Sequence, residues 1–523
     1  MYDILIKNGL VYDGSIDEPK NIDLAIKNGK IIKLDNLKNE QAKVEINAEN
    51  RFITPGFIDI NSDADHDLSL LEMPEAENLL RQGITTIIGG NCGASLAPLI
   101  SGSLSSINKW AKAIDLNFNW RTLKDLFYFL NGKKLNINFG TLIGWGTLRL
   151  DITQDQFRPL TKNELEQLKL IVKNSLKEGA FGVSFGLGYN IEQPVGLKET
   201  LEIAKIVNQT KGYLGFHLRD EAEGLLSSIR EILEVAEQEK VSLEISHLRA
   251  NGEENFESFS DALKMIKNIN QKNELVNFDF SPYDSTVRSA YLILPEWAAI
   301  GGREVLLKNI HDPIVRKKLI NDLKRKKYLY KDLIIADSGE RWWFAGKTLS
   351  EISDGFKLSL EETFLKLIEL CEHRLSVLTK TLSQILIDKG VVVDNSFIAT
   401  NSGIYNLDSG KKGIWVHPRA FGTFPKFLND YVKEKKLLSW SRAINKITGK
   451  VADKIGLKNR GYLKENYWAD LVILNPEKLK DKGTLDNPLQ YPDGIEIVVV
   501  NGNIAYQKGL LSHERYGQVL RKE

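Results

Sequence analysis

The middle of the chain alternates short apolar runs with longer amphipathic stretches. Eight of the apolar runs are candidate strands: FITPGFIDI, GITTIIGGN, INFGTLIGW, AFGVSFGLG, YLGFHLR, VSLEISHL, VNFDFSP and NSFIATNS. Two intervening stretches place apolar residues on one helical face, namely Leu165, Leu168, Val172 and Leu176, then Leu225, Ile229, Leu233 and Ala236. Apolar strands joined by helices indicate a parallel sheet covered on both faces. Because eight such strands can close on themselves, we predict an α/β fold, a (β/α)8 TIM-like barrel.

The two ends of the chain carry a different pattern, in which apolar and polar residues alternate over short stretches. Asn-Gly pairs begin at Asn8, Asn28 and Asn501 between these stretches, and this dipeptide is a strong hairpin signal. We therefore expect short β-strands at both termini that assemble into one small β-sandwich. The expected domain bounds are 1–54 and 456–523 for the two parts of the sandwich, and 55–455 for the barrel.

One long interval, near 288–346, breaks the alternation of strands and helices. It contains helical segments and the aromatic pair Trp342 and Trp343. We interpret it as an insertion on the active face of the barrel, where it would act as a lid or a substrate wall. A docked helical pair without any catalytic part is the other interpretation of the same pattern.

Composition excludes several functional classes. With 523 residues, 42% of them hydrophobic, the chain is long enough to bury a large core. A net charge of +1 without basic or acidic blocks gives no sign of a nucleic-acid or membrane partner, and leaves an oligomer open. The start MYDILIKNGL has no signal-peptide pattern, and no apolar run approaches the roughly 20 residues of a membrane span. Two cysteines make no disulfide framework, so we expect a cytoplasmic protein.

Three residues of the types that bind metals fall at predicted strand ends. Cys92 ends the second strand, His217 the fifth and His247 the sixth, although the chain has only seven histidines and two cysteines. In such barrels the chemistry lies at these strand ends. A lone cysteine or histidine there is more often structural, but the coincidence of all three favours a metal site. One thiolate and two imidazoles suit Zn²⁺, and three protein ligands leave a position open for water or substrate.

Four further residues are candidates for binding a substrate. Arg219 and Arg249 each lie two residues after one of the histidines, where a guanidinium could bind a substrate carboxylate through two hydrogen bonds. Each could equally form a structural ion pair, because acidic residues are adjacent. Tyr189 and Tyr283, in the loops after strands four and seven, would orient a substrate oxygen or simply line the pocket. We therefore expect a small-molecule substrate that carries a carboxylate.

Several segments together resemble a known family. TPGFID, RQGITTIIGGNCGASLAP, HLRDEAEGLL, EISHLRANG, HPRAFGTFP and ADLVILNP followed by NPLQYPDGIEIVVVNG resemble the D-aminoacylase, or N-acyl-D-amino-acid deacylase, branch of the amidohydrolase superfamily. The resemblance covers essentially the whole chain. It implies a barrel with a terminal β-sandwich, one zinc ion held by Cys92, His217 and His247, and a substrate carboxylate bound by Arg249. It also implies hydrolysis of an N-acyl-D-amino acid to a carboxylate and a D-amino acid.

The chain departs from this family where turnover depends most on particular residues. The His-x-His of the first strand is replaced by Asn61-Ser62-Asp63, and the aspartate that serves the family as general base is Ser402. A serine cannot take a proton from water as a carboxylate does, and such acid–base help is worth about 10²–10⁴-fold in rate. We therefore predict that Asp63 or Asp65, aimed into the same barrel mouth, provides the missing carboxylate. Asp408, in the loop after strand eight, is a weaker candidate.

Three functions remain open from the sequence. The first is a zinc-dependent amide hydrolase of the deacylase type with its base moved to the first-strand loop. The second is a catalytically silent barrel that binds an acylated amino acid or peptide fragment. The third is a metal hydrolase that opens a cyclic amide or an ester, whose leaving group needs less protonation. We favour the first, because the three zinc ligands, Arg249 and the HPRAFGTFP segment are all present.

Overall fold

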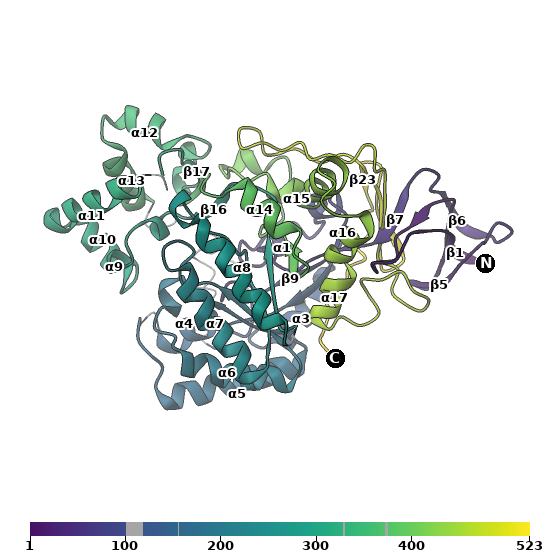
Figure 1. Ribbon diagram of the computed structural model, residues 1–523, viewed down its shortest axis with the longest axis horizontal. Helices are drawn as coiled ribbons and strands as arrows, with labels where there is room; N and C mark the ends of the chain where they lie inside the picture. Colours follow the sequence, from purple (N-terminus) through teal and green to yellow (C-terminus); the bar gives the residue numbers. More distant parts are fainter. Residues whose placement is uncertain (101–118, 155, 273, 328–329, 372–374) are drawn as a thin grey trace.

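The computed structural model describes residues 1–100, 119–154, 156–272, 274–327, 330–371 and 375–523. Figure 1 shows a central barrel, with the N-terminal strands at one end of the molecule and the helices α9 to α13 at the other. The predicted barrel with a sandwich built from both termini is confirmed.

The barrel contains one strand from each of the eight predicted runs. They are β8 (Phe57–Asp59), β9 (Ile84–Gly89), β10 (Asn138–Thr141), β12 (Gly182–Gly186), β13 (Tyr213–His217), β14 (Ser242–Ile245), β15 (Val276–Phe280) and β19 (Ser396–Ile398). All neighbouring pairs between these strands are parallel, with β11 (Ile143–Gly144) joining β10 to β12. Past the strand ends, the Asn401 N–H donates to the Asn61 carbonyl at 2.9 Å and closes the ring between β8 and β19.

Amphipathic helices cover the outside of the barrel. They are α1 (Ser69–Glu72), α2 (Glu77–Leu80), α3 (Leu123–Lys133), α4 (Trp145–Thr153), α5 (Lys162–Glu178), α6 (Leu197–Gln209), α7 (Leu225–Glu239), α8 (Phe256–Asn270), α14 (Gln384–Val391), α15 (Arg419–Phe427), α16 (Trp440–Ile447) and α17 (Gly449–Ile455). Local sequence sets their ends: α5 begins with a reciprocal capping box between Thr161 and Glu164 and ends at Gly179, whose φ is 115°. The two predicted helical faces belong to α5 and α7, and each is turned toward the core.

A separate unit lies between β15 and β19. Its sheet has the antiparallel order β16 (Thr286–Ser289), β18 (Ser376–Thr379), β17 (Ile334–Asp337). Its helices are α9 (Glu296–Ala299), α10 (Arg303–His311), α11 (Pro313–Arg325), α12 (Leu349–Phe356) and α13 (Leu360–Leu370). These elements share an apolar core of their own, so the unit reaches further along the chain than the interval 288–346. Residues 328 and 329 of that interval lie outside the described residues.

Two sheets form the terminal sandwich. One has the order β5 (Lys30–Asp35), β4 (Asp23–Lys27), β1 (Tyr2–Lys7), β6 (Ala42–Asn47). The other has the order β23 (Leu510–Leu511), β22 (Asn503–Gln507), β21 (Ile495–Val500), β20 (Leu471–Leu474), β7 (Phe52–Pro55), β2 (Leu10–Val11), β3 (Lys20–Asn21). Because β7 pairs with β20, strands from both ends of the chain share this sheet, and one apolar cluster joins the two sheets.

The three Asn-Gly pairs have different outcomes. Asn28 and Asn501 have φ angles of 51° and 49° and lie in tight hairpins, β4–β5 and β21–β22, as predicted. The hairpin predicted at Asn8 is wrong, because β1 and β2 belong to different sheets. The chain crosses between the sheets there, and Gly9 passes so close to Ile53 that a Cβ would lie 2.4 Å from its side chain.

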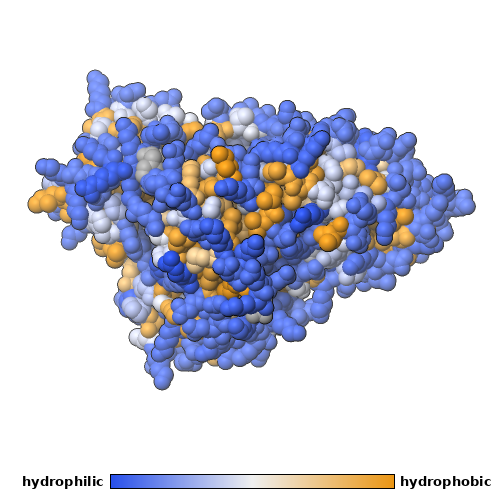
Figure 2. Space-filling view, viewed as in Figure 1, coloured by the Kyte–Doolittle hydropathy of each residue, from blue (hydrophilic) through white to orange (hydrophobic). Residues whose placement is uncertain are grey.

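The surface is mainly hydrophilic, as Figure 2 shows, with hydrophobic side chains gathered near the middle of the face drawn, in the region of α8, α14 and α16. Within the described residues, no helix has both the length and the apolar character that crossing a membrane would require.

Candidate metal centre and active site

Cys92, His217 and His247 converge at the carboxyl ends of β9, β13 and β14. One ligand atom from each lies within 4.8 Å of the other two, and all three side chains are buried. The Cys92 Sγ lies 3.5 Å from Nε2 of His247. Cys92 and His247 have φ angles of 51° and 45°, in the left-handed region that non-glycine residues rarely adopt. Such strain is concentrated at functional sites, where the surrounding structure enforces it.

The donor set fits zinc. Burial is the main reason that the pKa values of His217 and His247 fall below the usual range, so both imidazoles are neutral, as a metal ligand must be. The Nδ1 atom of His217 is buried and has no hydrogen-bond partner among the described residues. Burial, followed by the charge of Asp63, raises the pKa of the Cys92 thiol well above its usual range, and a bound cation would reverse this by stabilising the thiolate.

Glu221 connects the cluster to an arginine. Its Oε1 lies 2.9 Å from Nδ1 of His247, and its Oε2 accepts a hydrogen bond from Nε of Arg249 at 2.7 Å. Burial acts to raise the pKa of Glu221, but Arg249 and His247 hold it well below its usual range. The sequence prediction treated this carboxylate only as a neighbour that neutralises an arginine. Its position after β13, on the rim that carries the metal ligands, was the available signal.

A cavity of about 570 Å³ opens above the cluster and contains several of the predicted residues. Cys92, His217, His247, Arg249, Tyr189 and Asp63 all line it. Asp337 and Trp342 of the inserted unit line it from the other side, so this unit is a wall of the cavity. Tyr189 packs against His217, with ring centroids 4.7 Å apart.

Three predicted residues are not among those that line this cavity. Arg219 is bound to Glu231 through two hydrogen bonds, at 2.7 and 3.0 Å, and to two backbone carbonyls. Tyr283 donates to Asp481 at 3.0 Å and lines a smaller hollow of about 40 Å³ nearby. Asp65 is buried, and its Oδ2 accepts the Gly90 N–H at 2.7 Å. It therefore holds the loop that leads from β9 to Cys92.

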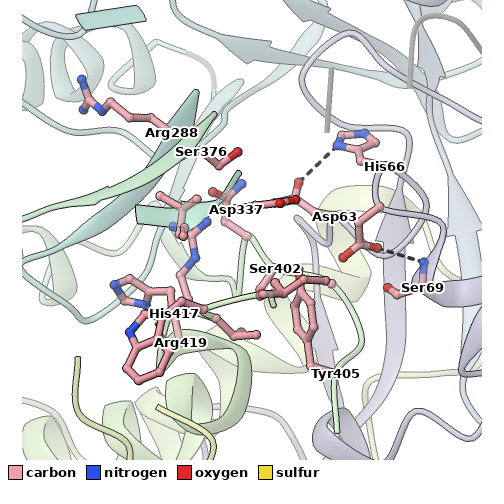
Figure 3. Close-up of a pocket in the computed structure, with 18 of the residues that line it drawn as sticks. Asp63, His66, Ser69, Arg288, Asp337, Ser376, Ser402, Tyr405, His417 and Arg419 are labelled. Carbon is pink, nitrogen blue, oxygen red and sulfur yellow. Dashed lines mark hydrogen bonds and ion pairs between the residues drawn. The ribbon is translucent and has the colours of Figure 1, made fainter. Parts of the chain in front are cut away.

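Asp63 is surrounded by positive charge. Nδ1 of His66 lies 3.3 Å from Oδ1 of Asp63, as Figure 3 shows, and Nε2 of His66 contacts the Ala94 carbonyl at 2.9 Å. Burial acts to lower the pKa of His66, but Asp65 and Asp63 raise it to about 9, so His66 is a buried cation at neutral pH. Burial acts to raise the pKa of Asp63, but His66 and then Arg419 hold it below its usual value.

The residues that replace family positions are integrated into the barrel. Asn61, in place of the first histidine, donates from Nδ2 to Asp279 at 3.1 Å. Trp145, which begins α4 directly after β11, is buried and donates its indole N–H to Glu199 at 2.7 Å. Ser402, in place of the general base, lines the cavity, and its carbonyl accepts the Asp63 N–H at 3.0 Å.

The HPRAFGTFP segment contributes two buried residues to the cavity. Nδ1 of His417 accepts the backbone N–H of Arg419 at 2.9 Å, and its Nε2 lies 3.0 Å from the Ser285 hydroxyl. The Arg419 guanidinium is buried, which lowers its pKa to about 10, and it faces the Asp63 side of the cavity in Figure 3. The sequence prediction recognised this segment as intact but assigned it no residue with a role.

The chain is similar over its full length to curated deacylases. The chain is 28% identical to an N-acyl-D-aspartate deacylase of Alcaligenes xylosoxydans xylosoxydans, over 99% of this chain and 95% of the relative. It is 24% identical to a D-aminoacylase of the same organism, over 100% and 98%. A family model described as Amidohydrolase family matches residues 413–506. The predicted resemblance to the D-aminoacylase branch of the amidohydrolase superfamily is confirmed by these relatives.

Solved structures of the family share the fold. An N-acyl-D-glutamate deacylase from Bordetella bronchiseptica, complexed with zinc and a phosphonate inhibitor, matches with a TM-score of 0.84 at 23% identity, over 99% of both chains. A crystal structure of D-aminoacylase matches with a TM-score of 0.83 at 24% identity, over 100% of both chains. The predicted fold, a barrel with a terminal β-sandwich, is therefore shared with these structures.

Proposed function

We propose that this protein is a zinc-dependent hydrolase that cleaves N-acyl-D-amino acids into a carboxylate and a free D-amino acid. The observation that carries the proposal is the buried cluster of Cys92, His217 and His247, open to a cavity that also contains Arg249. The deacylases among its full-length relatives support the choice of substrate class.

Cys92, His217 and His247 would hold one zinc ion. When bound, it would polarise the scissile carbonyl and lower the pKa of water to about 7. Arg249 is placed to bind the substrate carboxylate, since Glu221 and Thr286 fix its guanidinium through hydrogen bonds of 2.7 Å each. Tyr189 would position the substrate from beside His217.

The two aspartates predicted to be catalytic receive separate roles in this proposal. Asp63 faces the cavity as an anion held between His66 and Arg419, where it would stabilise the positive charge that develops on a leaving amine. Asp65 would not contact the substrate. It would accept the Gly90 N–H and so hold the loop that carries Cys92 in position.

One observation favours a second candidate, a catalytically silent barrel that binds an acylated amino acid or peptide fragment. Ser402 lines the cavity at the position where the family's general base is expected, and it has no carboxylate. A metal hydrolase that opens a cyclic amide or an ester remains the third, because its leaving group needs less protonation.

Metal analysis and a substrate panel separate these functions. Purified protein should contain close to one zinc per chain, and Cys92→Ala should lose it. Cys371→Ala is the matched control, because the other cysteine is buried in the inserted unit and should leave zinc unchanged. The panel would pair N-acetyl-D- and N-acetyl-L-amino acids, including aspartate and glutamate, with a cyclic amide and an ester.

Turnover of the D-series alone supports the deacylase. Zinc without turnover of any N-acyl-amino acid would rule it out, and activity on the ester or cyclic amide would then identify the third function. An inert protein that binds N-acetyl-D-amino acids would identify the silent barrel. Absence of zinc would refute the metal site itself.

A further inference from the structure

A third carboxylate of the first-strand loop, Asp67, reaches the same cavity. Asp67 lines it together with the metal cluster and Ser402. Its Oδ1 accepts the backbone N–H of Ser69 at 3.0 Å, an interaction drawn in Figure 3. Its Oδ2 is shielded from solvent. One edge of the carboxylate is therefore fixed by Ser69, and the other is packed inside the protein at the wall of the cavity.

The Oδ2 edge of the carboxylate faces the loop after β19, the loop that carries Ser402. A Cβ built on Gly403 would lie 1.9 Å from Oδ2 of Asp67. The carboxylate thus occupies space directly beside the residue that follows Ser402, on a different segment of the chain. Tyr405, from the same loop, approaches the carboxylate closely enough to lower its pKa.

The environments of Asp63 and Asp67 drive their protonation in opposite directions. Burial raises the pKa of Asp67 to about 7, against the hydrogen bonds of Ser69 and Tyr405, and the charge of Asp63 adds to the rise. The pKa of Asp63 is held below its usual value by His66 and Arg419. When two carboxyls in one site have pKa values pushed apart, the one with the lower pKa stays an anion and the one with the higher pKa can carry a proton. A proton carrier works best when its pKa lies near the operating pH.

We propose that Asp67 is the general base and general acid of this protein, and that it supplies from the first-strand loop the carboxylate that Ser402 lacks. This inference rests on the proposed amide hydrolysis and names the residue that moves its proton. It replaces Asp63 and Asp65 in that role and leaves Asp63 as the permanent anion beside it.

The proton balance is simple. The Asp67 carboxylate takes a proton from water as the water oxygen forms a bond to the amide carbon. Asp67, now a carboxylic acid, gives this proton to the amide nitrogen as the carbon–nitrogen bond breaks. Asp67 thereby returns to its ionised form. The second proton of the water passes from the new carboxylic acid to the amine, so the products are the carboxylate and the D-amino acid with a protonated amine. No oxidant, reductant or other co-reactant enters the step.

The test compares Asp67→Asn with the wild type, both loaded with zinc, on the N-acetyl-D-amino acid that the wild type turns over best. We expect kcat to fall by about 10²–10⁴-fold with little change in KM. We also expect the wild-type rate to rise with pH through about 7, as Asp67 ionises. The residual rate of the variant should show no such rise. Zinc content and Tm should be equal in the two proteins. Asp67→Ser replaces the Asn variant if the latter does not fold.

Two further variants sharpen the result. Adding Ser402→Asp to the Asp67→Asn protein should recover at least tenfold in kcat, because residue 402 lines the same cavity. Asp408→Asn is the matched control: it lies in the loop after β19, its carboxylate pairs with Lys411 and it is exposed, so both kcat and the pH profile should stay unchanged.

The outcomes distinguish this inference from the proposed function. Suppose that the wild type is active and that Asp67→Asn keeps more than a third of kcat and the same rise in rate near pH 7. This result overturns the role of Asp67 and leaves the proposed function intact. A zinc-loaded wild type that hydrolyses no member of the panel overturns the proposed function and the role of Asp67 with it.

Discussion

The carboxylate of Glu221 lies between Nδ1 of His247, at 2.9 Å, and Nε of Arg249, at 2.7 Å. One buried anion thereby positions a candidate metal ligand with one oxygen and a candidate substrate-binding residue with the other. A partner on Nδ1 sets the tautomer of the imidazole and directs Nε2 toward the Sγ of Cys92. The candidate metal ligand and the candidate substrate-binding residue are therefore coupled through a single side chain.

Replacing Glu221 by Gln should weaken zinc binding by about 10–100-fold, the usual effect of losing the partner of a ligating histidine. Gln keeps the size of the side chain but not the charge that stabilises His247 as a ligand. Competition with a chromophoric chelator measures the change. Glu231→Gln is the matched control, because Glu231 pairs with Arg219 instead. Equal zinc affinity in both variants would show that Glu221 does not support the metal.

Arg249 and Arg219 give a second contrast. Arg249→Gln should lower kcat/KM for N-acetyl-D-amino acids by about 10²-fold or more, because losing one partner of a buried charge pair costs about 2–5 kcal/mol. Arg219→Gln should leave kcat/KM nearly unchanged, since its guanidinium is bound to Glu231 and does not line the cavity. A substrate analogue with an amide in place of the carboxylate should be insensitive to Arg249→Gln. Equal loss for acid and amide would argue against carboxylate binding.

Gly403→Ala tests the contact between the two loops without changing any polar group. The added Cβ would lie 1.9 Å from Oδ2 of Asp67, so the carboxylate must move. We expect kcat to fall at least tenfold, with a loss of stability of about 1–3 kcal/mol as for other overpacked sites. Gly132→Ala in α3 is the control, because a Cβ there meets nothing within 4 Å. Unchanged kcat in Gly403→Ala would mean that the position of Asp67 is unimportant.

The parts of the fold that local sequence determines were predictable. Apolar runs and helical faces such as that of Leu168 and Val172 depend on neighbours along the chain, and they identified the barrel strands and their helices. Pairing between distant strands is not local, which is why the Asn8 turn was misassigned. That Cys92, His217 and His247 come together was predictable for a general reason: the strand ends of a parallel barrel meet at one rim.

The direction of individual side chains in the site was not predictable. Arg219 and Arg249 both follow a histidine by two residues, but Arg219 is drawn away by Glu231 of α7 while Arg249 faces the cavity. Asp67 was overlooked because its significance depends on Gly403, which is distant along the chain and adjacent only in the folded barrel.

Asp59 makes the barrel closure sensitive to pH. Its Oδ1 accepts the N–H groups of Asn61 and Thr400, at 3.2 and 3.1 Å, and its Oδ2 accepts the Thr400 hydroxyl, so it ties β8 to the loop after β19. Burial raises its pKa from 3.8 to about 7 despite these bonds. Between these two values the folded chain holds a proton that the unfolded chain has released. The free energy of unfolding must therefore fall as pH rises from about 4 to 7, and stay lowered above that.

Asp59→Asn removes this titration while keeping the two backbone bonds, and the Thr400 hydroxyl can rotate to accept from the new amide. The wild type should lose up to about 4 kcal/mol relative to this variant between pH 4 and 7, since each pKa unit corresponds to about 1.4 kcal/mol. Urea unfolding across this range measures the difference. Glu164→Gln should give the opposite sign, because Arg158 lowers the pKa of Glu164 to about 2, and ionised Glu164 stabilises the fold as pH rises. A flat difference for Asp59→Asn would show that Asp59 is ionised in the fold from about pH 4 upward, with its three hydrogen bonds outweighing its burial.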